Sequence, residues 1–272
     1  MSVRIAIVLF AFLPALYILR LDRFSREDWK HVLIDLAFLP RLFGYTAAIA
    51  AAIGLGFEES PFQSGSLEVA SRIGVRDYLA SHKVITFFAF VLWTSYINYW
   101  FHRLLHKIEA GWELHKVHHS ATRMTGFSWL RMHPIDEVLT NYVLGILTCI
   151  MVPELGTRTA ANYVLFISLH NIAIHSEWRA SWGRWSWVFT SPAAHQIHHS
   201  TNPKHFNSNF GAPFSVWDRL HGTYVDPFKS EAPTAYGVDD VSATNVRELL
   251  ISPIARSLAR LFAVSRPIKP YP

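Results

Sequence analysis

Histidine is concentrated in three short motifs of this chain, at spacings that are typical of metal ligands. The motifs are one HxxxH and two copies of HxxHH, and their histidines are His102 and His106, then His115, His118 and His119, and then His195, His198 and His199. Residues three and four apart lie on the same face of a helix, so we expect HxxxH to present two ring nitrogens on one side. We expect HxxHH to place its first and third histidines together, with the second close by. Eight imidazoles from three helical turns could hold two metal ions with about four nitrogen ligands each.

Other interpretations of these histidines are open. A single histidine at a helix interface is usually a hydrogen-bonded core residue, but this does not explain two copies of HxxHH. A solvated histidine tract is disfavoured because Leu104, Val117 and Ile197 give the motifs an apolar side. A proton relay in a transporter is a further alternative, although such a relay has no need of the HxxHH spacing.

The metal itself is less sharply predicted than the site. Imidazole suits iron, copper, zinc and nickel, and the spacing does not separate a pair of irons from a pair of zincs. The sequence has no HExxH pair, so a zinc peptidase would lack its general base. Cys149 is the only cysteine, which excludes an internal disulfide and a cysteine-based metal site.

The elements that must position the histidines have the composition of a membrane protein. Hydrophobic residues make up 51% of the chain and charged residues 17%, against about 25% charged in a soluble domain. Five apolar runs cover residues 5–19, 32–56, 84–101, 138–152 and 160–174. We therefore predict an all-α, polytopic integral membrane protein with about four to five transmembrane or re-entrant helices.

Charge placement predicts an orientation. Arg20, Arg23, Arg26 and Lys30 follow the first run, and by the positive-inside rule they belong on the cytoplasmic side. Counting runs from there places every histidine motif on the cytoplasmic side. Four tryptophans interleaved with arginines, Trp178, Trp182, Trp185 and Trp187, look like an interfacial belt. The net charge is +5, but the basic residues are dispersed, so we expect no nucleic-acid partner.

The chain reads as one domain with three parts. Residues 1–82 would anchor it in the membrane, residues 83–225 would form the catalytic region, and residues 226–272 would form a tail. The tail begins with a loop, and "VRELLISPIARSLARLF" then predicts an amphipathic helix with its arginines at one interface.

Five segments together resemble the fatty acid hydroxylase/sterol desaturase superfamily, over roughly residues 85 to 225. They are "NYWFHRLLH", "HKVHHS", "LRMHPIDEVL", "TSPAAHQIHHS" and "NFGAPFSVWDRLHGTY". The resemblance implies a membrane-embedded non-haem enzyme with two iron ions, held by the eight histidines, and with O2 as co-substrate. Such enzymes hydroxylate or desaturate lipid C–H bonds with electrons from a reductase.

The resemblance also marks residues outside the three motifs. "LHNIAIHSEW" lies where the family places further histidines, so His175 and His170 are candidate ninth and tenth ligands. "SEW" followed by "TSPAAHQIHH" is similar to the alkylglycerol monooxygenase branch. His133 matches a family "RxHP" and is expected to support the site or the structure.

The closing motif of the family has counterparts and departures here. Asn209, Trp217 and Asp218 match it, and a carboxylate there could orient an imidazole or cap a helix. Ser95 stands where the family commonly has Asp, Asn207 where an acidic residue is frequent, and His221 replaces a common Phe. These departures concern the support of the ligands and not the ligands themselves.

The sequence thus predicts an O2-dependent oxidoreductase that hydroxylates a fatty acyl, sterol or ether lipid. A desaturase with the same metal site is the nearest alternative, and a non-redox membrane metal-binding protein is the next. A hydrolase with two zinc ions is disfavoured, because no carboxylate is clustered with the histidines. The chain has no flavin, haem or nicotinamide motif, so the expected partners are a lipid from the bilayer and an external reductase with a cytochrome or ferredoxin type of carrier.

Overall fold

The computed structural model describes residues 25–39, 78, 81–141 and 157–262. Within these ranges the regular elements are helices, and β pairing is limited to two isolated bridges. The predicted all-α class is therefore confirmed. The predicted run at 5–19, and most of the runs at 32–56 and 138–152, lie outside the described residues.

Helix α6, Lys83–Lys107, includes the predicted run at 84–101 and continues through the first histidine motif. Its 25 residues would extend about 37 Å at about 1.5 Å per residue, which exceeds the roughly 30 Å hydrocarbon core of a bilayer. Among the described helices it alone is long and apolar enough to cross a membrane, as judged by length and composition. His102 and His106 lie on its last turns, so the helix that could span the bilayer also carries candidate ligands.

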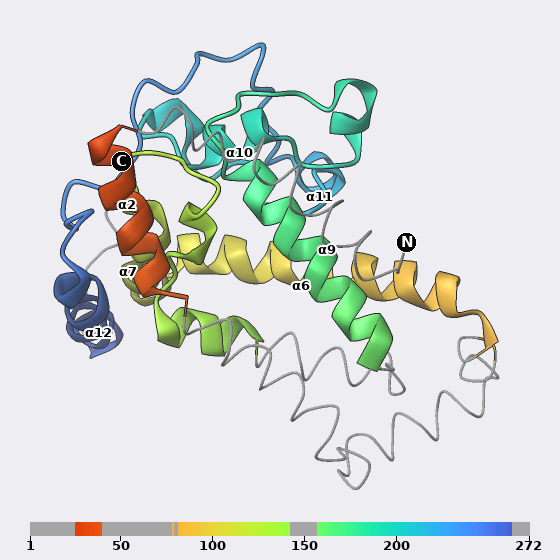
Figure 1. Cartoon of the computed structure of the whole chain (residues 1–272), viewed down its shortest axis with the longest axis horizontal. Coiled ribbons are helices and arrows are strands. Elements are labelled where there is room, and N and C mark those ends of the chain that lie inside the picture. Colours follow the sequence, from red (N-terminus) through yellow and green to blue (C-terminus); the bar gives the residue numbers. More distant parts are fainter. Residues whose placement is uncertain (1–24, 40–77, 79–80, 142–156, 263–272) are drawn as a thin grey trace, which may run out of the picture.

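Helix α9, Thr157–Ile174, lies across α6 (Figure 1). The two helices share a core formed by Phe90 and Val91 of α6, Tyr163 of α9 and Phe214. The rings of Phe90 and Tyr163 meet edge to face with their centroids 4.8 Å apart, which is a favourable geometry for an aromatic pair. This packing brings the end of α9, and His175 just beyond it, toward the end of α6.

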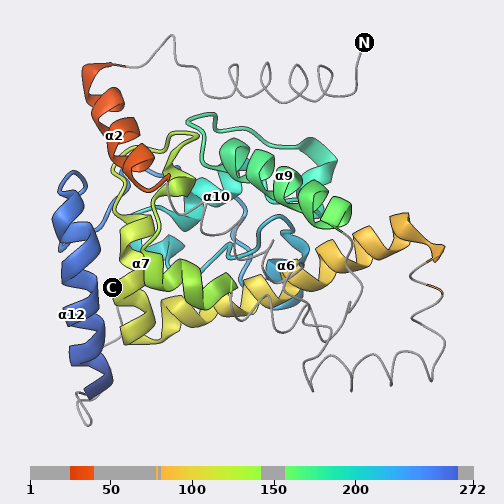
Figure 2. The ribbon, with the colours of Figure 1, turned by 60° about the horizontal axis from the view of Figure 1, so that its bottom comes forward.

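Helices α7, Glu109–His119, and α12, Val246–Phe262, run side by side (Figure 2). Helix α12 has the bounds that the sequence predicted for the amphipathic tail helix. Its Leu249 is fully buried in a core with Val117 of α7. Arg256 and Arg260 pair with Glu113 of α7 at 3.1 and 3.4 Å, so these two arginines fasten the tail to the body of the protein.

Helix α2, Arg26–Ala37, changes the interpretation of the run predicted at 32–56. Residues 32–37 belong to this helix, which starts with a capping box between Ser25 and Asp28 and ends at Ala37. Its inward face is partly polar, and its Asp35 is fully buried against Arg131 at 2.7 Å. The start of this run is thus a helix docked on the protein body, because Asp35 has a buried cationic partner.

The other elements are short and connect the histidine segments. They are η3 (Ser128–Leu130), η4 (Gly183–Trp187), α10 (Pro192–His198), η5 (Pro203–His205) and α11 (Val216–Leu220). Helix α10 begins in a favourable way, since Ser191 accepts a hydrogen bond from the Ala194 amide at 3.3 Å and Pro192 occupies the first turn.

Candidate metal centre

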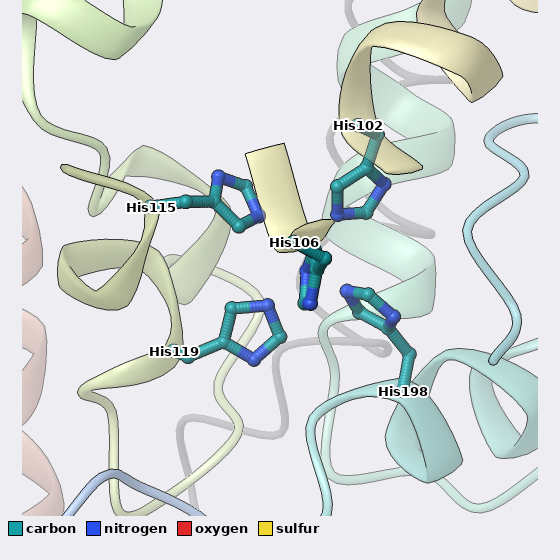
Figure 3. Close-up of side chains that lie close together, drawn as sticks. All are labelled: His102, His106, His115, His119 and His198. Atoms are coloured by element: carbon teal, nitrogen blue, oxygen red, sulfur yellow. The ribbon is translucent and has the colours of Figure 1, made fainter. Parts of the chain in front are cut away.

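Nine of the ten histidines named as candidate ligands lie in two groups. Within each group the ring nitrogens that could bind a metal lie within 4.8 Å of one another. The first group is His102, His106, His115, His119 and His198, and the second is His118, His175, His195 and His199. Figure 3 shows the five rings of the first group turned toward a common centre. Among the described residues, neither group includes a carboxylate or a cysteine.

Helical spacing explains how the motifs divide between the groups. The first and last histidines of each HxxHH are four apart and share a group, as His115 and His119 do in the first and His195 and His199 in the second. The middle histidine, His118 or His198, belongs to the opposite group. Each HxxHH motif therefore contributes to both groups and links them.

Hydrogen bonds to Nδ1 fix the orientation of five rings. Nδ1 of His115 bonds to a carboxylate oxygen of Asp136 at 2.8 Å. Four other Nδ1 atoms bond to backbone carbonyls at 2.8 to 3.1 Å; these are Nδ1 of His102 to Phe210, of His118 to Arg131, of His175 to Asn171 and of His198 to Ser208. Since a carbonyl oxygen only accepts, Nδ1 carries the proton in these four rings, and the Nε2 lone pair is left for a metal.

The remaining ring nitrogens fit metal ions. In the first group all five Nε2 atoms are buried and have no hydrogen-bond partner. In the second group Nε2 of His175 lies 3.3 Å from that of His118 and 3.0 Å from that of His195, and the His195–His199 distance is 3.1 Å. Ligands at about 2.0 to 2.1 Å from one metal have nitrogens at about this separation. Buried polar atoms left unpaired are costly, so the unpaired Nε2 atoms of the first group fit an ion, and the second group has the nitrogen separations that ligands of one ion would have.

Burial also keeps five of these imidazoles neutral, which metal ligation requires. Burial, with neighbouring imidazoles adding to it, lowers the pKa of four histidines well below the usual range; they are His118, His119, His195 and His199. Burial lowers the pKa of His198 to about 3, although its bond to Ser208 opposes the change. The rings therefore stay unprotonated at neutral pH even before a metal binds.

His170 and His133 lie outside both groups. Nε2 of His170 is 3.2 Å from the carbonyl oxygen of Thr190, so this ring ties α9 to the start of the α10 segment. His133 bonds through Nε2 to the Leu250 carbonyl at 3.0 Å, and its Nδ1 accepts from the Ile135 amide at 3.2 Å. Both nitrogens of His133 are thus used, in agreement with the structural role expected for it.

The closing motif supports the site through the backbone. The carboxylate of Asp218 accepts from the amides of Phe210 and Gly211 at 2.8 and 2.7 Å. The carbonyl of Phe210 accepts the hydrogen bond of His102, so Asp218 orients that imidazole indirectly, through the backbone. Asn209 donates to the carbonyl of Ala194 at 2.9 Å. Ser95, where the family commonly has Asp, accepts from the Trp217 indole at 3.0 Å.

Among the described residues, Asp136 is the carboxylate that touches a candidate ligand directly, and sequence reasoning did not single it out. It lies in "LRMHPIDEVL", 21 residues after His115. Its Oδ1 also accepts from Thr140 at 3.2 Å, and its side chain is completely buried. The sequence signal for Asp136 was its position three residues after His133, in a segment that was considered only for that histidine.

One cavity opens on both histidine groups. It has a volume of about 160 Å³ and is lined by His102 and His115 of the first group and by His118, His175 and His195 of the second. Its other walls come from α6, from α9 and from helical residues 134–141. A molecule in this cavity would therefore meet both metal positions at once.

Comparison with known proteins agrees with this arrangement. The fatty acid hydroxylase family matches residues 87–223, about half of the chain. Alkylglycerol monooxygenase of Xenopus tropicalis is 29% identical over 127 residues, which are 47% of this chain and 28% of the relative. A probable Delta(7)-sterol 5(6)-desaturase of Neurospora crassa is 32% identical over 139 residues, 51% of this chain and 38% of the relative.

Human lathosterol oxidase is 28% identical over 156 residues, which cover 56% of this chain and 50% of that relative. The chain thus spans half or less of the length of these three relatives. No solved structure matches it significantly.

Proposed function

The chain belongs to the fatty acid hydroxylase family, and from this membership we propose that it is a membrane-bound, non-haem di-iron oxidoreductase that uses O2 to hydroxylate a C–H bond of a lipid. The observation that carries the proposal is the pair of all-histidine groups facing one cavity. A structural zinc site would need four ligands and no cavity, whereas an oxygenase needs both a metal pair and access for a substrate.

We propose nine of the predicted ligands as the metal set. Five would hold one ion and four the other, in the groups described above. Iron bound there would supply the removal of a hydrogen atom from an unactivated C–H bond and the transfer of one oxygen atom from O2. In this assignment His170 holds α9 in place and ligates no metal, since its Nε2 is bonded to Thr190.

The protein's own residues would position the ligands and exclude water. Asp136 holds His115 in one orientation, and Asp218 holds the backbone that orients His102. Phe101 and Leu105 of α6 and Ile167 of α9 give the cavity apolar walls. These apolar parts of the wall, next to the proposed metals, would admit part of a lipid chain and keep bulk water away from the reacting carbon.

The proposed setting is a multi-pass membrane protein with the metal site on the cytoplasmic side. Its 1–82 part would anchor the 83–225 catalytic region, and the 226–272 tail would close one domain. The apolar helix α6 supports one crossing, and the exposed side chains of Trp185 and Trp187 suit an interfacial position. The electrons would come from a separate reductase and carrier.

Desaturation of the lipid is the second candidate reaction. Two relatives carry names of sterol desaturation or oxidation, and the same histidine groups would serve both reactions. Hydroxylation inserts one oxygen atom of O2, while desaturation removes a second hydrogen atom and releases both oxygen atoms as water. The position of the lipid in the cavity would decide between the two outcomes.

The decisive experiment combines metal analysis with lipid mass spectrometry. The purified full chain should contain two irons, and cells that express it under isotopically labelled O2 should accumulate a lipid with one labelled oxygen. A product that has lost two hydrogens and gained no label would identify a desaturase. Tightly bound zinc together with no change in any lipid would overturn the proposal in favour of a non-redox metal-binding protein.

A further inference from the structure

The cavity beside the histidine groups is too small for a whole lipid. Its volume of about 160 Å³ is less than the roughly 300–1,000 Å³ of pockets that enclose drug-sized ligands. The cavity is partly open, so its described walls would enclose only the part of a lipid that lies next to the histidine groups. The side chains that line the cavity would therefore contact this short part of the substrate and not a distant headgroup.

Two asparagines in the cavity wall each lie four residues before a proposed ligand. Asn98 precedes His102 by four residues on α6, and Asn171 precedes His175 by four residues at the end of α9. Residues four apart lie one above the other on a helix. Each carboxamide therefore lies one turn from an imidazole, and the two asparagines approach the cavity from different helices. Ser168, three residues before Asn171, also lines the cavity.

These polar side chains have no hydrogen-bond partner in the described part of the chain. The other polar side chains of the wall are engaged nearby: Asn141 donates to Glu137 at 2.9 Å, and Thr140 donates to Asp136 at 3.2 Å. No corresponding bond exists among the described residues for the side chains of Asn98, Asn171 or Ser168. Within the described residues, the hydrogen-bonding groups of these three side chains are therefore available to a molecule in the cavity.

An unbranched apolar substrate would leave this capacity unused. Covering an amide with a hydrocarbon chain removes water from it and gives no hydrogen bond in return, which is unfavourable. A substrate with an oxygen atom at this point would instead receive a hydrogen bond from an asparagine NH2, or donate one from its hydroxyl to the amide oxygen. The wall therefore favours a lipid that is polar close to the reacting carbon.

We propose, on the basis of the function above, that Asn98 and Asn171 bind a hydroxyl, ether or carbonyl oxygen of the substrate within one helical turn of the carbon that reacts. The substrate class is then a lipid oxidised close to its polar end, or close to a ring hydroxyl, and not in the middle of an acyl chain. The two asparagines act as specificity residues, and the histidine groups remain responsible for the chemistry.

Binding without turnover tests this inference. The purified full chain, metal-loaded in detergent and kept free of O2, would bind radiolabelled hexadecan-1-ol, which is displaced by unlabelled hexadecan-1-ol or by hexadecane. We expect the alcohol to compete about tenfold better than the alkane, which corresponds to 1.4 kcal/mol. Asn98→Leu and Asn171→Leu should each remove most of this preference while leaving the affinity for hexadecane equal or higher.

The control variant is Asn162→Leu, which changes an exposed asparagine of α9 that does not line the cavity, and it should keep the full preference. Equal competition by both probes in the wild type, or an unchanged preference in both cavity variants, would overturn the inference. Iron content and labelled-oxygen incorporation are measured separately. A protein that prefers the alcohol but forms no product would refute the proposed function alone.

Discussion

At the residue scale, the adjacent histidines His118 and His119 are assigned to different metal groups. A histidine pair in one motif would ordinarily be expected to serve one ion. The spacing made the pairing of first and last histidines predictable, because positions four apart share a helix face. The middle histidine belongs to the other group because α6, α10 and His175 meet in space. The spacing within one motif gives no information about such a tertiary contact.

This division gives a sharp prediction for single substitutions. His119→Ala removes a proposed ligand of the first group, and His118→Ala removes a proposed ligand of the second. We expect each variant to retain about one metal ion per chain in place of two, because the other ligand set stays complete. Elemental analysis of the purified variants measures this directly, and each should also lose product formation.

The matched control is His170→Ala, since His170 is bonded to the Thr190 carbonyl and stands in neither group. It should keep both ions. Loss of both ions in His118→Ala and in His119→Ala alike would show that the two groups do not bind independently, and loss of an ion in His170→Ala would restore it as a ligand.

The buried imidazoles also predict how the metal-free protein responds to acid. Burial holds the folded-state pKa of His198 at about 3 and lowers that of His118, His119, His195 and His199 well below the usual range. The unfolded chain has ordinary histidines with pKa near 6.5. Below that pH the unfolded state binds more protons, so stability is greatest above about pH 6.5 and falls as the pH drops toward the folded-state values.

Within this window, each such histidine lowers the free energy of unfolding by up to about 1.4 kcal/mol for each unit by which the pH falls. Thermal unfolding of chelator-treated protein in detergent, recorded between pH 8 and pH 5, should show a melting temperature that declines steeply below pH 6.5. The His170→Ala variant should show a somewhat shallower decline, because burial lowers the pKa of His170 to about 4 and this histidine adds its own share to the pH dependence. A melting temperature that is flat across this range would contradict the assignment of neutral, buried imidazoles.

At the scale of elements, α2 shows where prediction from sequence stopped. Hydropathy correctly indicated α6 and α12, because apolar runs and amphipathic spacing are local properties. The run at 32–56 was read as one apolar segment interrupted by Asp35. The ion pair that gives Asp35 its place joins residues 96 positions apart, and such a contact has no local signal. Asp136, which holds His115, escaped notice for the same reason.

The Asp35–Arg131 pair links α2 to the proposed metal site. Both side chains are fully buried, and the Arg131 carbonyl accepts the hydrogen bond of His118. Asp35→Leu would leave the Arg131 charge buried without its partner, a change that typically costs about 3–5 kcal/mol. We expect a large fall in the melting temperature and weaker retention of the metal in the second group.

The same helix offers the control. Glu27 and Lys30 form an ion pair at 2.6 Å with both side chains largely exposed, and exposed pairs contribute about 0–1 kcal/mol. Glu27→Leu should therefore melt close to the wild type. Equal melting temperatures for Asp35→Leu and Glu27→Leu would show that α2 is not fastened through its buried aspartate.

At the scale of the whole molecule, the proposed reaction requires a particular orientation in the membrane. This orientation can be measured at the two ends of α6. The exposed side chains of Val84 and Lys107 lie at opposite ends of this helix. If α6 spans the bilayer with its histidine end in the cytoplasm, Lys107 faces the cytoplasm and Val84 the other side. The histidine groups would then lie where a cytoplasmic carrier can deliver electrons, while the cavity stays open to a lipid from the bilayer.

Cysteine labelling measures this orientation. Val84→Cys and Lys107→Cys are placed singly in a Cys149→Ser background, which removes the only native cysteine, and sealed vesicles of known sidedness are treated with a membrane-impermeant maleimide. We expect Lys107→Cys to react only from the cytoplasmic face and Val84→Cys only from the opposite face. Reaction of both from one face would mean that α6 lies on the protein body without crossing, and the lipid would then have to reach the cavity from the membrane surface.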